Sequence, residues 1–148
     1  MEFDKTRSAG NLIQEIARLH AAALQRALVP LGLSRAQFLV LSELWSEDGL
    51  TQRELTLRLM VEQATMASTL GRMERDGLIE RRPHPDDGRS QQVWATQAAR
   101  NLREPAVRAA VDADLELASG LPAAERELFQ SMLRRIAGNL GPNRGGET

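Results

Sequence analysis

Apolar residues recur every three or four positions through most of this chain, and that spacing predicts a mainly α-helical protein. The first helix is expected over residues 10–29 and a fourth over residues 63–75. Between them, a second and a third helix begin at Ser34 and Thr51. Each of these two residues is followed three positions later by a glutamine or a glutamate, which is the spacing of a capping box.

A two-residue alternation replaces this spacing in two short segments, residues 78–82 and 91–96. Between them lie Pro83, Pro85 and an Asp-Gly pair, all of which favour a turn. The two segments are therefore predicted to form a β-hairpin with a long tip. Two short helices followed by a basic hairpin describe a winged helix-turn-helix, which places one helix in a DNA groove.

Helical spacing returns after the hairpin, over residues 97–118. We expect a kink or an interruption near residues 101–105, because the ring of Pro105 clashes with the preceding turn and lacks an N–H. Gly120 separates this stretch from a last helix that begins at Pro122.

The first and last helices carry apolar stripes that are too long for a small winged domain to cover. Exposed stripes would form a large patch, which soluble monomers rarely show, whereas a two-fold dimer would bury them. The residues expected at this dimer interface are Leu12, Ile16, Leu128, Phe129, Met132 and Ile136.

The predicted fold is mainly α with a small β-hairpin wing: a winged helix-turn-helix core flanked by dimerisation helices. Residues 1–32 form the N-terminal dimerisation helix and residues 33–98 the DNA-binding domain. Residues 99–140 form the C-terminal dimerisation helices, and residues 141–148 are expected to be a disordered tail.

Composition narrows the possible functions. The 148 residues include no cysteine, which excludes disulfides and thiol sensing, and the two histidines are too far apart in sequence to suggest a metal cluster. No cofactor is expected, and an enzyme ranks last, because no nucleophile–base pair or phosphate loop is recognisable. No signal peptide or membrane span is visible, so a cytoplasmic protein without a membrane partner is expected.

The fourth helix contains the residues that are candidates for recognising the DNA sequence. Once its inward positions are removed, the polar face contains side chains that suit base edges and phosphates. These candidates are Gln63, Ala64, Thr65, Ser68 and Arg72. The same face would also suit ordinary solvation, and the helix alone does not decide between the two.

The hairpin favours DNA, because arginine at a rigid tip suits a narrow minor groove. The candidate wing residues are Arg81, Arg82, His84, Asp87, Arg89 and Ser90. Asp87 is expected to hold Arg89 or a neighbouring arginine through a bidentate ion pair. The alternative is a solubilising hairpin of mixed charge.

Three segments of this chain resemble the MarR family of bacterial transcription regulators: residues 50–55 (LTQREL), 78–83 (LIERRP) and 87–90 (DGRS). The resemblance implies a homodimer whose two winged domains read a pseudo-palindrome in double-stranded DNA, with Arg89 in the minor groove. Two departures stand out. Met60 lies in a turn where the family often has glycine, and Gly71 lies inside the recognition helix, at a cost of up to about 1 kcal/mol relative to alanine.

Many members of this family respond to small aromatic molecules, and His20 and Trp45 are the candidate residues for such a cleft. Each has an ordinary alternative, Trp45 as a core residue and His20 as part of the dimer contact. The function expected is therefore a homodimeric repressor that a small-molecule effector releases from its operator. The alternatives are a regulator that is insensitive to ligand and a winged-helix dimer that binds protein.

Overall fold

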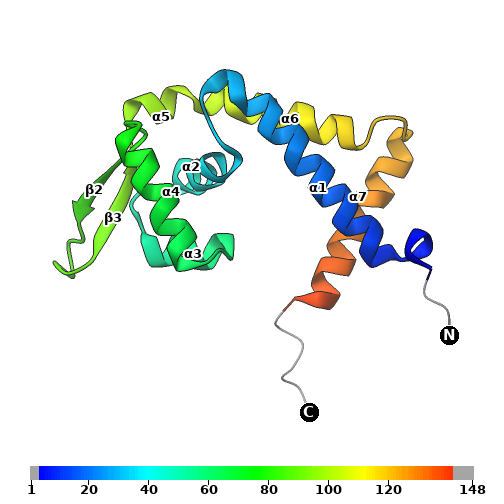
Figure 1. Cartoon of the computed structure of the whole chain (residues 1–148), viewed down its shortest axis with the longest axis horizontal. Helices are drawn as coiled ribbons and strands as arrows, with labels where there is room; N and C mark the ends of the chain where they lie inside the picture. The colour runs from blue at the N-terminus through cyan, green and yellow to red at the C-terminus, as the bar shows by residue number, and fades with distance from the viewer. Residues whose placement is uncertain (1–3, 142–148) are drawn as a thin grey trace, which may run out of the picture. The chain divides into compact units, whose positions relative to one another are not determined.

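The computed structural model describes residues 4–141, and it consists mostly of helices with one small antiparallel sheet (Figure 1). The predicted fold class is confirmed. Of the predicted tail, all but Gly141 lies outside the described residues. The elements are η1 (Lys5–Arg7), α1 (Ala9–Leu28), η2 (Val29–Leu31), α2 (Arg35–Ser46), β1 (Leu50–Thr51), α3 (Gln52–Leu59), α4 (Gln63–Arg75), β2 (Ile79–Pro83), β3 (Gln91–Ala95), α5 (Gln97–Asn101), α6 (Arg103–Leu117) and α7 (Ala123–Leu140).

Contacts divide the chain into two compact units, residues 1–113 and residues 114–148, and each is described by itself. The first unit contains α1 to α5, the sheet and most of α6, and the second contains the end of α6 and α7. These units are defined by contacts within a single chain, whereas a dimerisation segment is defined by contacts between two chains. The predicted division into dimerisation and DNA-binding segments therefore stays a prediction.

The core of the first unit is one apolar cluster to which helices and sheet both contribute. Fully burying a leucine or methionine side chain contributes about 1.5–3 kcal/mol, so a few such residues hold the elements together. The fully buried side chains are Leu28 of α1, Val40, Leu41 and Leu44 of α2, Leu55 of α3, Met66, Leu70 and Met73 of α4, and Val93 of β3.

Both predicted capping boxes are present. The Ser34 hydroxyl accepts from the Gln37 N–H at 3.1 Å, and the Gln37 side chain accepts from the Ser34 N–H at 3.0 Å. The same exchange joins Thr51 and Glu54 at 3.2 and 2.7 Å. These contacts satisfy N–H groups that would otherwise lack partners, and so they determine where α2 and α3 begin.

The hairpin is confirmed, and it belongs to a three-stranded sheet of order β1-β3-β2. Strand β2 pairs with β3 so that Ile79 faces Ala95 and Pro83 faces Gln91. Strand β1 (Leu50–Thr51) pairs with the other edge of β3. The sequence did not predict β1, because two residues show no periodicity.

The predicted interruption after the hairpin is also confirmed. Helix α5 ends at Asn101 and α6 begins at Arg103, with only Leu102 between them. Pro105 lies in the first turn of α6, where backbone N–H groups have no helical partner, so its missing donor does little harm.

Met60 ends α3 in the left-handed conformation, with φ 49° and ψ 47°. Among residues 4–141 it is the only residue other than glycine with positive φ. Its side chain is 89% exposed, so the methionine gains little from packing there. Glycine adopts this left-handed conformation freely. For a residue with a side chain, such as Met60, the same conformation costs about 1–2 kcal/mol of folding free energy.

No single helix in residues 4–141 is long and apolar enough to cross a membrane. The segments Ala9–Leu31 and Arg35–Ser46 reach that length and composition only when taken together, and they are bent by 79° at the break.

Gly49 offers a test of close packing behind the sheet. A Cβ added there would lie 2.6 Å from Cζ2 of Trp94, and its φ is +77°. Gly32 has a similar φ of +70° but open space around it, and so it is a matched control.

We expect Gly32→Ala to cost about 1–2 kcal/mol of folding free energy from backbone strain, and Gly49→Ala about 1–3 kcal/mol more from overpacking. Urea denaturation at one protein concentration measures both, and equal losses would show that the Trp94 contact is easily relieved.

Candidate nucleic-acid interface

Helix α4 has one side in the core and the other in solvent. Met66, Leu70 and Met73 are at most 1% exposed. Every residue of α4 that was predicted to read DNA is exposed, namely Gln63, Ala64, Thr65, Ser68 and Arg72. The division between inward and outward positions is therefore as predicted, while contact with DNA stays a prediction.

The carboxyl end of α4 is held by backbone and side-chain hydrogen bonds. Gly77, with φ +71°, turns the chain so that the Leu78 N–H donates to the Met73 carbonyl at 2.9 Å, as in a Schellman motif. The buried Gln37 side chain of α2 donates from Nε2 to Oδ2 of Asp76 at 3.0 Å. Because Gln37 also completes the cap of α2, one side chain links the start of α2 to the end of α4.

Arg81 lies at the base of the wing and contacts both helices of the helix-turn-helix. Its Nε is 3.5 Å from Oε2 of Glu74 on α4, and its Nη1 donates to Oε1 of Gln52 on α3 at 3.4 Å. The side chain is only 24% exposed. Arg81 therefore braces the wing against α3 and α4, and the prediction that it contacts DNA is not tested by these contacts.

Arg82 is likewise occupied within the fold. It pairs with Glu80 on the same strand, and its guanidinium lies over the Trp94 ring, 4.6 Å from the ring centroid. Such a cation–π contact stabilises by about 0.5–1 kcal/mol at an exposed site. The Trp94 ring is thus covered by Arg82 on the wing, and it lies against Gly49.

The tip of the wing is a compact turn of hydrogen bonds. The His84 N–H donates to the Ser90 carbonyl, and the Ser90 N–H donates to the Asp87 carbonyl, both at 3.0 Å. His84 Nδ1 accepts from the Asp86 N–H at 3.1 Å, and Asp87 Oδ1 accepts from the Arg89 N–H at 3.0 Å. The tip therefore has a defined backbone path.

The predicted ion pair between Asp87 and an arginine is wrong. The Asp87 carboxylate binds the backbone N–H of Arg89, and within residues 4–141 no ion pair joins it to an arginine side chain. A short acidic side chain commonly bonds the backbone two residues later in a turn, and this local contact competes with a longer ion pair. The Arg89 side chain is consequently exposed, with no partner among the described residues.

Asp48 is a residue whose role the sequence did not reveal. Its Oδ1 accepts from the Gly49 N–H at 3.1 Å and from the Ala95 N–H at 2.9 Å, and its Oδ2 lies 3.6 Å from Nη1 of Arg100. Arg100 in turn donates to the Ala95 carbonyl at 2.7 Å. The sequence could not reveal these contacts, because partners 47 residues apart leave no local signal.

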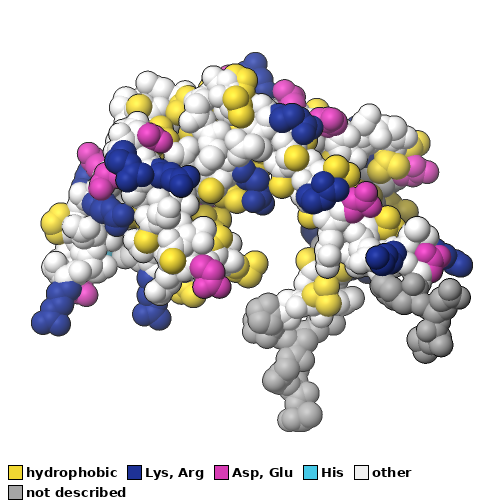
Figure 2. Space-filling model, in the orientation of Figure 1, with side chains coloured by type: hydrophobic (Ala, Val, Ile, Leu, Met, Phe, Trp, Pro, Cys, Tyr) yellow, Lys and Arg dark blue, Asp and Glu magenta, His cyan; other side chains and the backbone are white. Residues whose placement is uncertain are grey.

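Basic side chains gather over the part of the first unit that contains α4 and the wing, with acidic side chains among them (Figure 2). Two acids of this region, Glu74 and Glu80, pair with wing arginines. Residues 63–90 contain five arginines and five acidic residues, so the formal charges of α4 and the wing balance. What matters for an anionic partner is therefore which arginines lack an acidic partner.

The two candidate ligand residues lie in different surroundings. Trp45 donates from Nε1 to the Ala99 carbonyl at 3.1 Å and packs edge-on against Phe38, with ring centroids 6.1 Å apart. These contacts make Trp45 part of the core. His20 is half-buried on α1. A ligand contact by either residue stays a prediction.

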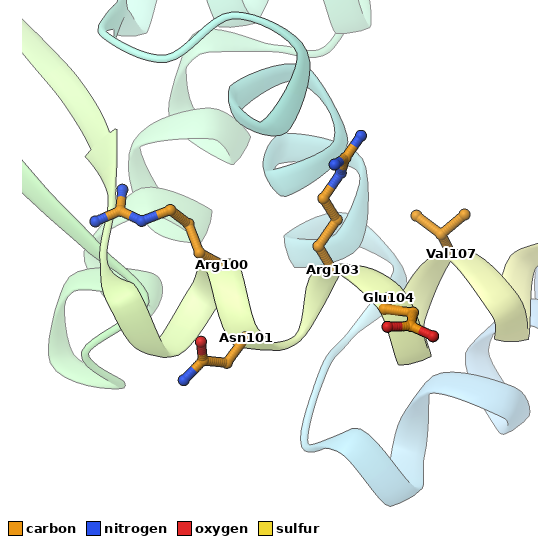
Figure 3. A pocket seen from close by; sticks show the side chains of 5 residues that line it. All are labelled: Arg100, Asn101, Arg103, Glu104 and Val107. Carbon is orange, nitrogen blue, oxygen red and sulfur yellow. The ribbon is translucent and has the colours of Figure 1, made fainter.

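An open hollow of about 590 Å³ lies at the junction of α5 and α6 (Figure 3). It is lined by Arg100, Asn101, Arg103, Glu104 and Val107. Figure 3 shows Asn101 pointing away from the side on which Arg100 and Arg103 extend, so the polar groups do not converge. This hollow therefore lacks the geometry of a binding site.

The predicted dimer residues are largely exposed in the single chain. Helix α7 has no buried residue, and α1 buries only Leu24 and Leu28. Phe129 is half-buried, and the other predicted interface residues are between 40% and 58% exposed: Leu12, Ile16, Leu128, Met132 and Ile136.

Comparisons with known proteins agree with this architecture. The model of the MarR family matches residues 33–91. Transcriptional regulator HosA of Escherichia coli O111:H- is 28% identical over 124 residues, which cover 84% of this chain and 90% of HosA. An HTH-type transcriptional repressor of Mycobacterium tuberculosis is 28% identical over 127 residues, covering 86% of this chain and 91% of the repressor. A crystal structure of MarR is 30% identical, with a TM-score of 0.78 over 88% of this chain and 95% of that chain.

The chain belongs to the MarR family. This MarR-family protein is a transcriptional regulator with a DNA-binding winged helix and not an enzyme. The matched segment runs from just before α2 to the start of β3, so it contains α4 and the wing tip.

The Thr51–Glu54 capping box of this MarR-family protein predicts a pH dependence. The hydrogen bond from the Thr51 N–H holds the pKa of Glu54 below its usual value. A carboxyl with a lowered folded-state pKa stabilises the fold above its unfolded pKa of about 4.3, and this contribution is lost as the pH falls through the folded pKa. We expect Glu54→Ala to cost roughly 0.3–1.5 kcal/mol at pH 7 and less once the wild-type carboxyl is protonated, because a neutral carboxyl oxygen accepts a weaker hydrogen bond.

Urea denaturation of Glu54→Ala and wild type at pH 7 and at several values below pH 4.3 measures this difference. Glu54→Gln keeps a side-chain acceptor without a titrating charge, and it should lose less than alanine at pH 7. A loss in Glu54→Ala that stays constant with pH would contradict the charge contribution.

Proposed function

We propose that this protein is a homodimeric, sequence-specific repressor that binds a pseudo-palindromic operator and acts in the bacterial cytoplasm. The observation that carries the proposal is the joint exposure of one face of α4 and of the Arg89 side chain at the wing tip. The core supports α4 from its other face, which is fully buried.

In this proposal α4 enters the major groove. Gln63 and Arg72 offer bidentate hydrogen bonds to base edges, the Thr65 methyl suits thymine, and Ser68 suits a phosphate. The small side chain of Ala64 lets the first turn of α4 lie close to the DNA. The first turn of α4 has no side-chain cap at Glu62, so its backbone N–H groups are free to attract a phosphate.

The wing then lies along the adjacent minor groove, where a narrow width concentrates negative potential. Arg89 enters the groove. His84, Asp87 and Ser90 act through the turn that presents it, since their hydrogen bonds define the tip. The pairs formed by Arg81 and Arg82 support the same orientation from the base of the wing, near the phosphates.

The dimer is supported by the exposed apolar side chains of α1 and α7. Exposed apolar stripes on the helices of soluble proteins usually mark an interface, and a two-fold arrangement lets a stripe be covered by a second copy. Two winged domains related by such an axis would read half-sites roughly 34 Å apart, one turn of the duplex.

Repression is supported by the Mycobacterium tuberculosis relative, which is a transcriptional repressor. We further propose release by a small aromatic effector, which must bind two dimer conformations with different affinities. A difference of about 1–3 kcal/mol would weaken operator binding 5- to 150-fold. His20 is the residue we propose to contact the effector, and Trp45 would act through the core that it joins.

Replacing Arg89 tests the wing. Arg89→Ala should weaken binding to a duplex selected from random sequences by about 1.5–3 kcal/mol and reduce the salt slope by about one, because one charged contact is lost. Arg89→Lys should retain charge but lose the planar fork, and so give an intermediate loss. Fluorescence anisotropy across a salt series measures both.

Arg103→Ala is the matched control, since Arg103 is an exposed arginine on α6 and lies outside α4 and the wing. Wild-type affinity in Arg89→Ala would show that the wing does not contribute. Failure of the wild type to select any duplex at low salt would favour a winged helix that binds protein.

Replacing Met132 tests the dimer. Met132→Glu would bury a carboxylate without a partner, which costs several kcal/mol, so we expect a monomer in sedimentation equilibrium. Leu57→Glu is the control, because Leu57 is 66% exposed on α3 and lies outside α1 and α7. A Met132→Glu protein that dimerises as tightly as wild type would remove α7 from the interface.

A further inference from the structure

Gly71 lies in the interior of α4, although glycine weakens a helix interior more than any residue except proline. Nothing in the described chain requires glycine there. Its φ lies outside the left-handed region, and a Cβ added at this position would meet no atom within 4 Å. The neighbouring side chains therefore leave room for the methyl group of alanine.

Helical spacing places Gly71 on the outward side of α4. Residues three and four positions apart lie on the same face, so Gly71 falls in one row with Ser68 and Arg75, both of which are exposed. The buried positions Leu70 and Met73 lie on the other side of the helix. Any group that takes advantage of the missing side chain must therefore come from outside the chain.

We propose that Gly71 is a positioning residue of the DNA interface: it lets the backbone of α4 approach the duplex more closely than a side chain would allow. The inference rests on the proposed DNA-binding function. A methyl group at this position would have to stay about 3.5–4.0 Å from any carbon atom of the duplex, and it would hold the third turn of α4 away. Arg72, the next residue, and Ser68, one turn earlier, would then lose reach toward bases and phosphates.

The proposal predicts that stability and DNA affinity change in opposite directions. Gly71→Ala and Gly71→Leu both introduce good helix formers on the outward side of α4, where an added Cβ meets no atom, so each should raise Tm by a few degrees. Affinity for the duplex selected with wild-type protein should fall roughly tenfold in Gly71→Ala and further in Gly71→Leu, because the larger group separates the surfaces more.

Gly138→Ala is the matched control. Gly138 also lies inside a helix, α7, with no atom within 4 Å of an added Cβ. It is two residues from Ile136, so helical spacing puts it on a different face from the apolar stripe. The control should raise Tm by a similar amount and leave dimerisation and DNA affinity unchanged.

Fluorescence anisotropy with that duplex, thermal denaturation and sedimentation at one protein concentration give the three readouts. Gly71→Ala with raised Tm and wild-type affinity would overturn the inference and leave the proposed function intact. A wild-type protein that selects no duplex would overturn the proposed function itself.

Discussion

The Asp48 carboxylate follows the end of α2 and contacts both the end of β3 and Arg100 of α5, and the geometry of the wing depends on it. One oxygen accepts from the Ala95 N–H at 2.9 Å, which fixes where β3 stops, and the other faces Arg100 at 3.6 Å. Leaving a buried N–H without its acceptor would cost about 1–3 kcal/mol. The same corner brings Gly49 against Trp94, so the strand that carries the wing is packed against the chain entering β1.

The wing shows how a chain of nearly neutral charge can leave one arginine side chain without an acidic partner. Glu74 and Glu80 are matched with Arg81 and Arg82 at the base, where these arginines serve the fold. At the tip, the Asp87 carboxylate is used by the backbone and does not pair with Arg89. Each exposed ion pair contributes little to stability. Here the pairs occupy Arg81 and Arg82, so the Arg89 guanidinium is the one on the wing that remains available to bind a partner.

Local sequence signals predicted most of this structure. The capping boxes at Ser34 and Thr51 and the break before Pro105 all follow from contacts within a few residues. The contacts that escaped prediction join distant parts of the chain, such as the Asp48 contacts and the pairing of β1. The role of Asp87 was misjudged for a different reason: a local turn contact prevailed over a plausible ion pair.

The exposure of α7 within its own chain links its structure to the concentration of the protein. An isolated helix of 18 residues is only marginally stable in water, and α7 buries none of its residues within its own chain. Its order therefore depends on whatever covers it. If a second copy does so, mass action ties the folded state of α7 to subunit concentration. The folded fraction of α7 would then rise and fall with the concentration of the protein. Dilution alone would separate the two subunits and so end the fixed spacing of their winged domains.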